Sequence, residues 1–288
     1  MTIYVRIDEG LGNQLFQYAF GRALEAEGKM VKYDINAYHF RSIHQGFELS
    51  RIFGLTLNLA SFAEIKKLFG DFYSLAGRVK HKIFGYRNRR NIVREASYHT
   101  FNYHPEYLHP EEGSYMRGYW QAWQYPNKIK SLLKSQLQFP PSNNSQFHKV
   151  CEEIQTTNSV GIHIRRGDYL KSPHHQVLPL NYYESAIHII EQHIMEPKYF
   201  IFSNDPEWAK ENLNLSHMQI VDMNKGAESY RDMQLMSMCK ALIIANSSFS
   251  WWGAWLNQNI HPLIIAPKLW FSRDHTIKDI WLPSWTVI

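Results

Sequence analysis

The chain has 288 residues, of which 44% are hydrophobic and 20% charged. This balance excludes a disordered chain, and no run reaches the ~18 apolar residues that a membrane span needs. The length fits one large domain or two ordinary ones. A formal net charge of +5 is mild, and we expect no nucleic-acid partner.

The composition also bears on the cellular compartment. The first residues, MTIYVRIDEGLGNQ, lack the basic and apolar regions of a signal peptide, so none is expected. Two cysteines, Cys151 and Cys239, are too few for a disulfide framework. We expect both to be reduced core residues of a cytoplasmic protein.

The first 35 residues predict a βαβ unit. Residues 2–7 read as a buried strand, and residues 9–13 (EGLGN) as a glycine-rich turn. Apolar side chains then recur at helical spacing as far as Gly28, and residues 31–35 form a second predicted strand.

A basic run lies in the middle of the chain, where residues 62–92 have helical apolar spacing. A solvated face is one explanation of this run, and contact with nucleic acid, an anionic membrane or a phosphorylated lipid-linked substrate are the others. We keep peripheral contact with the inner face of the membrane as an expectation. The basic run consists of Arg78, Lys80, Lys82, Arg87, Arg89, Arg90 and Arg94.

Residues 139–145 (FPPSNNS) read as a linker or exposed turn, and we expect domains at 1–150 and 151–288. The second half alternates strands, at 160–164, 199–202, 218–221, 241–245 and 263–266, with helices at 182–193, 207–212, 229–239 and 249–257. This alternation predicts a doubly wound parallel sheet. The near-continuous apolar strands agree with burial on both faces.

Polar residues follow the carboxyl ends of four of these strands. In open parallel sheets the ligand crevice lies just outside these ends, so a nucleotide or sugar-phosphate pocket is expected there. The four groups are Arg165 to Asp168, Ser203 to Asp205, Asp222, and Asn246 to Ser248.

Arg165 and Arg166 are the strongest candidates for contacting phosphate, because the guanidinium fork matches phosphate oxygens and stays charged. The alternative is that one of them pairs with Asp168 and braces the turn. His163 shares a strand face with Arg165 and is expected in the same pocket.

The segment from Asn246 to Ser250 leads into a helix whose first hydroxyl and N–H groups could bind an anion or simply cap the helix. Three tryptophans in this helix, at 251, 252 and 255, are expected to pack in the core. Asp205 could accept hydrogen bonds from guanine, or cap the helix that begins near residue 207.

Gly10 to Gln14 do not form a complete G-x-G-x-x-G fingerprint. Asp34 is the one acidic residue near the expected ribose position. The turn could still bring backbone amides and the Asn13 side chain to a phosphate or a sugar. There is no D-x-D pair of carboxylates for a divalent cation, so no metal is expected.

Several blocks together resemble the α-1,2-fucosyltransferases of glycosyltransferase family 11. Residues 163–169 (HIRRGDY) are similar to the family's H-x-R-R-G-D-Y motif, and residues 10–19 (GLGNQLFQYA) to its opening motif. Later blocks are similar as well, and the likeness spans nearly the whole chain. They are residues 118–121, 202–205, 232–257 and 266–271.

The resemblance implies an α/β fold of GT-B type, with two Rossmann-like lobes and a cleft between them. It implies GDP-L-fucose as donor, inversion, no metal and no other cofactor, with residues 1–150 as the acceptor-side lobe and 151–288 as the donor lobe. Arg165 would hold the β-phosphate, with Arg166 beside it. The remaining donor-binding residues would be Gly12, Asn13, His163, Asp205, Ser247, Ser248, Phe249 and Ser250.

The chain departs from the family at Glu9, where glycine is usual, and at Ala241, where histidine is common. Glu9, Asp8 and Asp168 are the candidate general bases, and the alternative is a loose transition state that needs no strong base. The acceptor is expected to be a galactose-terminated oligosaccharide or lipid-linked glycan. Tyr119, Trp120 and Trp123 are the candidates for stacking on its sugar rings, and packing inside the protein is the alternative role for these aromatic side chains.

Two other classes compete with a transferase. A dinucleotide-dependent epimerase or reductase predicts a complete G-x-G-x-x-G and a Tyr-x-x-x-Lys pair, and neither occurs. A glycan- or nucleic-acid-binding module would use the aromatic residues and the basic run without chemistry. Binding of GDP but not ADP separates the transferase from such a module.

Overall fold

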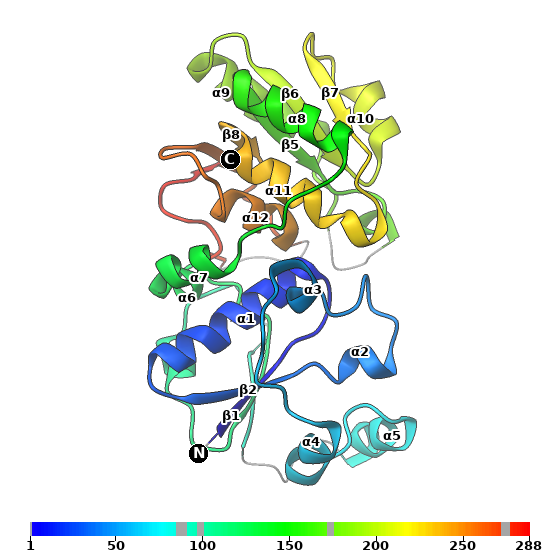
Figure 1. Ribbon diagram of the computed structural model, residues 1–288, viewed down its shortest axis with the longest axis vertical. Coiled ribbons are helices and arrows are strands. Elements are labelled where there is room, and N and C mark those ends of the chain that lie inside the picture. Colours follow the sequence, from blue (N-terminus) through cyan, green and yellow to red (C-terminus); the bar gives the residue numbers. More distant parts are fainter. Residues whose placement is uncertain (1, 85–90, 97–100, 172–175, 272–276) are drawn as a thin grey trace. The chain divides into compact units, whose positions relative to one another are not determined.

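The computed structural model describes residues 2–84, 91–96, 101–171, 176–271 and 277–288, and the chain forms two compact units (Figure 1). Unit 1 comprises Met1–Gln138 and Lys278–Ile280, and unit 2 comprises Phe139–Ile277 and Trp281–Ile288. The units divide just before the predicted linker. The boundary expected at residue 150 falls inside a helix, α8 (Ser145–Thr156).

Unit 1 is built on a parallel sheet with the strand order β2-β1-β4-β3 within the described residues. Its elements are β1 (Thr2–Arg6), α1 (Leu11–Ala26), β2 (Met30–Asp34), α2 (Ala37–Phe40), α3 (Leu49–Phe53), α4 (Phe62–Phe69), α5 (Leu75–Phe84), β3 (Ile92–Arg94), η1 (Pro105–Leu108), β4 (Tyr115–Arg117), α6 (Gln124–Lys128) and α7 (Lys130–Gln136). The predicted βαβ unit is confirmed, because β1 pairs with β2 in parallel.

The glycine-rich turn is shorter than predicted. Gly10 is the N-cap residue, with φ −81° and ψ 171°, and α1 already begins at Leu11. Gly12 and Asn13 therefore lie in the first turn of α1. The backbone N–H groups of a first turn can bond to the cap residue but to no carbonyl further inside the helix. The expectation of a turn through Asn13 is wrong for this reason.

The region from 62 to 92 is not one helical stretch. Gly70 ends α4, Asp71 and Ser74 form a new cap, and α5 follows as a separate helix. Ile92 lies in the short strand β3, which together with β4 was not predicted. Each of these strands has three residues and ends in arginine, so neither carries the apolar run by which buried strands are identified. Residues 85–90 of the basic run lie outside the described residues.

Unit 2 is built on a six-stranded parallel sheet with the order β10-β9-β8-β5-β6-β7 in the described part of the chain. Besides α8, its elements are β5 (Ser159–Ile164), η2 (Tyr169–Lys171), α9 (Leu180–His193), β6 (Lys198–Ser203), α10 (Pro206–Asn212), β7 (Met218–Val221), η3 (Gly226–Glu228), α11 (Tyr230–Met238), β8 (Ala241–Ile243), α12 (Ser248–Trp255), β9 (Leu263–Ala266) and β10 (Thr286–Val287).

This order is that of the doubly wound nucleotide-binding fold, with β5 as the first strand and a switch point between β5 and β8. All five strands predicted in this half are present, and β5 is buried along its whole length. The tryptophans of α12 are buried, so their predicted core role is confirmed. Cys151 and Cys239 are free, but only Cys239 is fully buried. None of the helices in the described ranges is long and apolar enough to cross a bilayer.

Candidate active site

Three of the four predicted strand-end groups of unit 2 come together at the switch point. The backbone N–H groups of Arg166 and Gly167 donate to Asn204 Oδ1 at 2.9 and 3.3 Å, which joins the segments after β5 and β6. The hydroxyl of Tyr169 donates to the carbonyl of Asn246 at 3.1 Å, which joins the segments after β5 and β8. The fourth group, Asp222, is exposed after the edge strand β7.

The two arginines of this site each make an ion pair within unit 2. Arg165 Nη2 lies 2.9 Å from Asp168 Oδ2, as the bracing alternative predicts. Arg166 Nε lies 3.2 Å from Asp205 Oδ2, and its guanidinium lies 4.2 Å from the centre of the Trp208 ring. Both side chains remain partly exposed, so their other N–H groups can reach a ligand.

The carboxylates in these pairs have structural partners. Asp168 Oδ1 accepts from Asn204 Nδ2 at 3.0 Å. Burial acts in the opposite direction, but the charge and hydrogen bonding of Arg165 lower the pKa of Asp168. Asp205 caps α10 by accepting from the Trp208 N–H at 3.3 Å, so the capping interpretation of this residue is confirmed.

His163 lies at the end of β5 beside the helix α12. Its ring centroid is 5.9 Å from that of Phe249. Burial, with the charge of Arg165 as the next cause, lowers the pKa of His163 to about 3. The imidazole is therefore neutral at physiological pH and can offer one donor and one acceptor.

Polar atoms of this site lack hydrogen-bond partners within the described residues although they are buried. They are His163 Nδ1, Arg165 Nε and Asn246 Oδ1. Buried polar atoms are normally satisfied, and each exception calls for an explanation. All three belong to the ends of β5 and β8 that meet at the switch point, which is the arrangement expected of a polar ligand site.

The serines at the start of α12 do not all face a ligand. Ser247 is the N-cap, and its Oγ accepts from the Phe249 N–H at 3.3 Å. Ser248 is partly exposed in the first turn. Ser250 is fully buried, with its hydroxyl 3.3 Å from the carbonyls of Ala245 and Ser247, so it supports the turn from inside.

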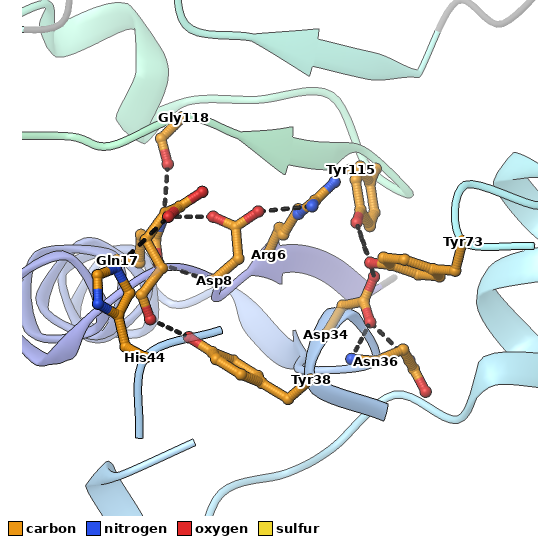
Figure 2. Close-up of polar contacts among 11 residues, drawn as sticks. Arg6, Asp8, Gln17, Asp34, Asn36, Tyr38, His44, Tyr73, Tyr115 and Gly118 are labelled. Atoms are coloured by element: carbon orange, nitrogen blue, oxygen red, sulfur yellow. Dashed lines mark hydrogen bonds and ion pairs between the residues drawn. The ribbon is translucent and has the colours of Figure 1, made fainter. Parts of the chain in front are cut away.

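In unit 1 a second polar cluster forms after β1 (Figure 2). Arg6 is buried and pairs with Asp8, with Nη2 2.5 Å from Oδ2. Burial opposes the charge of Arg6, but Asp8 and the neighbouring acidic groups outweigh burial and raise its pKa. Gln17 of α1 donates to Asp8 Oδ1 at 3.3 Å and to the carbonyl of Gly118 at 3.1 Å. Gln17 thus joins the ends of β1 and β4.

Glu9 is half-exposed next to this cluster and has a left-handed backbone, with φ 69°. Its carbonyl accepts from Tyr38 Oη at 2.7 Å and from Gln14 Nε2 at 3.0 Å. Its carboxylate is 3.9 Å from His44 Nε2. Burial, followed by the charge of Asp8, raises the pKa of Glu9.

Asp34 and Asn13 have defined partners in unit 1. Asp34 is completely buried and accepts from the hydroxyls of Tyr73 and Tyr115 at 2.6 and 2.7 Å, so it is a structural carboxylate in this fold (Figure 2). Asn13 Oδ1 accepts from Gln121 Nε2 at 2.7 Å, a bond that uses the side-chain oxygen and not the N–H₂ donors of Asn13.

The aromatic candidates for acceptor stacking differ in exposure. Tyr119 is exposed, whereas Trp120 is fully buried and stacks on Phe20 with 4.1 Å between ring centroids. The packing alternative therefore holds for Trp120. Trp123 is half-buried at the start of α6, and its N–H donates to the carbonyl of Asp279 at 2.8 Å.

We expect Trp120→Ala to affect stability and Tyr119→Ala to affect acceptor binding. Trp120→Ala should lower the free energy of unfolding by ~3–5 kcal/mol, because it empties a large core volume. Tyr119→Ala should raise the acceptor KM and leave stability within ~0.5 kcal/mol. Urea unfolding and acceptor titrations measure both effects. An unchanged acceptor KM for Tyr119→Ala would exclude the stacking role.

Glu95 was not predicted, yet it holds the segment that carries these aromatic residues. Its Oε2 accepts from the Tyr119 N–H at 2.6 Å, and Oε1 accepts from the Trp120 N–H at 3.1 Å, where Trp120 has φ 56°. Burial raises the pKa of Glu95 to about 8, although these two hydrogen bonds act in the opposite direction. No local motif marks this residue, because its partners lie more than twenty positions later in the chain.

The raised pKa of Glu95 predicts how stability depends on pH. The folded state holds this proton more tightly than the unfolded state, so the free energy of unfolding should fall as the pH rises from about 4.5 towards about 8. Glu95→Gln should remove this part of the decline. Urea unfolding at pH 6 and pH 8.5 measures it, and the exposed Glu207→Gln is the control that should keep the wild-type slope.

Gln17 could have been found from the sequence, because it lies four residues after Asn13 and therefore on the same side of the helix. The structure shows that it is buried. Arg6, inside a strand, and Glu95 gave no comparable signal. Within the part of the chain that is described, no three His, Cys, Asp or Glu side chains are grouped as metal ligands would be.

Sequence comparisons agree with the predicted family. The model of glycosyl transferase family 11 matches residues 2–288. An α-1,2-colitosyltransferase of Escherichia coli is 34% identical, over 95% of this chain and 94% of that protein. The O-antigen biosynthesis glycosyltransferase WbnK of Escherichia coli is 32% identical, over 98% and 99%. The galactoside α-(1,2)-fucosyltransferase 2 of Gorilla gorilla gorilla is 24% identical, over 67% of this chain and 61% of that protein.

The fold is also that of a solved transferase. The crystal structure of the α-1,6-fucosyltransferase NodZ soaked with GDP-fucose has a TM-score of 0.58 to this chain, at 14% identity, and covers 93% of this chain and 95% of NodZ. Together with the two parallel α/β sheets, this likeness confirms the predicted GT-B class. The chain belongs to glycosyl transferase family 11.

Proposed function

We propose that this protein transfers L-fucose from GDP-β-L-fucose to the 2-hydroxyl of a galactose-containing glycan, as an inverting and metal-independent enzyme. The main support for a donor site in unit 2 is that buried polar atoms of His163, Arg165 and Asn246, at the switch point, have no hydrogen-bond partner among the described residues. The family and its O-antigen and galactoside relatives support the reaction class and a surface polysaccharide as product.

In this proposal unit 2 holds the nucleotide. Arg165 and Arg166 neutralise the diphosphate, and the first turn of α12, with Ser247, Ser248 and Phe249, adds N–H groups and the positive end of its dipole. His163 and Asp205 contact the guanosine. The Asp205 carboxylate would then bind both the guanosine and Arg166, with which it already forms an ion pair. Ser250 acts by supporting the turn beneath these groups.

The chemistry is a single displacement at the anomeric carbon. The acceptor 2-hydroxyl attacks this carbon, the bond to the β-phosphate oxygen breaks, and GDP leaves with the electron pair. We assign the hydroxyl proton to Glu9, because Asp8 is bound to Arg6 and Gln17 while Asp168 is bound to Arg165 and Asn204. Asp168 then orients Arg165. Gly12 and Asn13, at the start of α1, contact the donor sugar or its phosphates from unit 1.

A donor assay tests this function. With a panel of galactose-ended glycans, the protein should form an α-1,2-linked fucoside from GDP-fucose, with NMR reporting inversion, and excess EDTA should leave the rate unchanged. GDP at about 100 times its Kd should add ~2.7 kcal/mol to the free energy of unfolding, and ADP should add little. Retention of configuration, inhibition by EDTA, or no stabilisation by GDP would contradict the proposal.

The similarity to a colitosyltransferase makes GDP-colitose the second candidate donor. Colitose is the 3-deoxy counterpart of L-fucose, so the two donors differ by one hydroxyl group. A site that hydrogen-bonds this hydroxyl rejects the analogue lacking it by as much as ~10⁴-fold. We therefore expect kcat/KM for GDP-fucose to exceed that for GDP-colitose by at least ~100-fold, and the reverse ratio would reassign the donor.

Peripheral contact with an anionic membrane, through residues 78–94, is part of the proposal. It would bring the enzyme to a lipid-linked acceptor.

A further inference from the structure

Helix α5 of unit 1 presents an apolar stripe to solvent. Leu75, Val79 and Ile83 are 79%, 53% and 67% exposed. They are spaced four residues apart, and at about 100° per residue this places them within about 80° of one another on the helix surface. The preceding helix α4 lies at the same edge of unit 1 (Figure 1), and its Leu68 is also exposed. Single exposed apolar residues are ordinary, but an aligned stripe on one helix is a patch.

The stripe does not hold α5 onto unit 1. The helix start is fixed instead by Asp71, which accepts from the Ser74 N–H at 2.9 Å, and by Ser74, whose Oγ accepts from the Gly77 N–H at 3.1 Å. Gly77 is buried, and a Cβ there would be 2.1 Å from the Asp71 carbonyl oxygen, so the backbone itself packs closely. Within the described residues, the apolar stripe therefore remains open to another partner.

Cations flank the stripe on both sides. At about 100° per residue, Lys82 and Arg78 lie about 20° and 60° beyond the Leu75 edge of the stripe on the helix surface. Lys80 lies about 60° beyond the opposite edge, at Ile83. All three are exposed, as are Lys66 and Lys67 of α4. Between residues 66 and 84 Asp71 is the one acidic residue, and it is engaged in the cap and with Lys66 at 3.5 Å.

We infer that α5 is an interfacial helix that places Leu75, Val79 and Ile83 in the headgroup region of an anionic lipid bilayer. Aliphatic residues on one face with flanking lysine and arginine are the features of helices that lie in the membrane plane. A nucleic-acid site would need only the cations, so it would not explain the three exposed aliphatic side chains. This inference rests on the membrane contact in the proposed function and is independent of the transfer chemistry.

Vesicle sedimentation tests the inference. The full chain should bind vesicles of 70% phosphatidylcholine and 30% phosphatidylglycerol, and bind pure phosphatidylcholine far more weakly. The variant Leu75→Ser/Val79→Ser/Ile83→Ser should lose about 100-fold or more in partition coefficient, because aliphatic burial is lost. Arg78→Gln/Lys80→Gln/Lys82→Gln should lose about 100-fold, roughly fivefold per charge, together with most of the salt dependence.

Two exposed apolar residues of unit 2, Met195 (83%) and Ile260 (89%), provide the matched control. Met195→Ser/Ile260→Ser should bind vesicles like wild type. All three variants should keep wild-type activity on a soluble acceptor, which separates failure of this inference from failure of the proposed function. Unchanged binding of the serine stripe variant would overturn the insertion, as would a wild-type dimer that this variant converts to a monomer.

Discussion

Replacing Arg165 by alanine should lower kcat by ~100- to 1,000-fold while the protein remains folded. Negative charge accumulates on the departing diphosphate as the glycosidic bond breaks, and one well-placed donor to such an oxyanion is worth ~3–4 kcal/mol. The effect should appear in kcat more than in the Kd for GDP-fucose, because the charge is greatest in the transition state. Arg165→Lys should recover part of the rate, since lysine keeps the charge but loses the planar fork.

Arg22 is the matched control for Arg165. Both arginines pair with a carboxylate three residues later, and their side chains are 27% and 29% exposed. Arg22→Ala, on helix α1, should therefore match Arg165→Ala in stability and keep wild-type activity. An Arg165→Ala enzyme whose kcat is close to that of Arg22→Ala would exclude Arg165 from the phosphate site.

Glu9→Gly should make the protein more stable and nearly inactive at the same time. Glycine adopts φ 69° without the strain of about 1 kcal/mol that a side chain incurs there, so the free energy of unfolding should rise by up to that amount. If Glu9 receives the acceptor proton, its loss should lower kcat by ~100-fold or more. Chemical unfolding and initial rates measured on the same preparation test both halves.

The pH profile distinguishes Glu9 from the other carboxylates. The base must be ionised, so kcat should fall as the pH drops through the pKa of Glu9, which burial and Asp8 raise above its usual value. Glu9→Gln should remove this acidic limb along with most of the rate. Asp168→Asn should keep the limb, because Asp168 acts through Arg165. A fully active Glu9→Gly enzyme would return the base to Asp8 or Asp168.

The sequence predicted unit 2 much better than unit 1. Parallel strands buried on both faces are continuous apolar runs, so strands such as β5 and β6 are visible without any knowledge of their neighbours. Strands β3 and β4 are short and polar-ended, and only pairing with β1 and with each other makes them strands. Their positions depend on contacts between residues far apart in the chain.

The candidate site shows the same division. The residues after β5 and β8 were predicted because motif and strand ends coincide at Arg165 and Ser247. The ion pair of Arg166 with Asp205 and the support of Tyr119 by Glu95 depend on three-dimensional proximity across 39 and 24 residues, which no local pattern records. The burial of Trp120 was equally invisible, because tryptophan suits both a sugar-binding surface and a core.

The segment Lys278–Ile280 belongs to unit 1, although the sequence on both sides of it belongs to unit 2. Asp279 accepts from the Tyr103 N–H and from Gln124 Nε2 at 2.9 and 2.8 Å, and Ile280 is fully buried. In a hybrid that joins the N-terminal half of one relative to the C-terminal half of another at residue 138, residues 278–280 would therefore come from a different parent than the unit 1 residues they pack against. Chimaeras that exchange donor specificity should carry residues 278–280 from the same parent as residues 1–138.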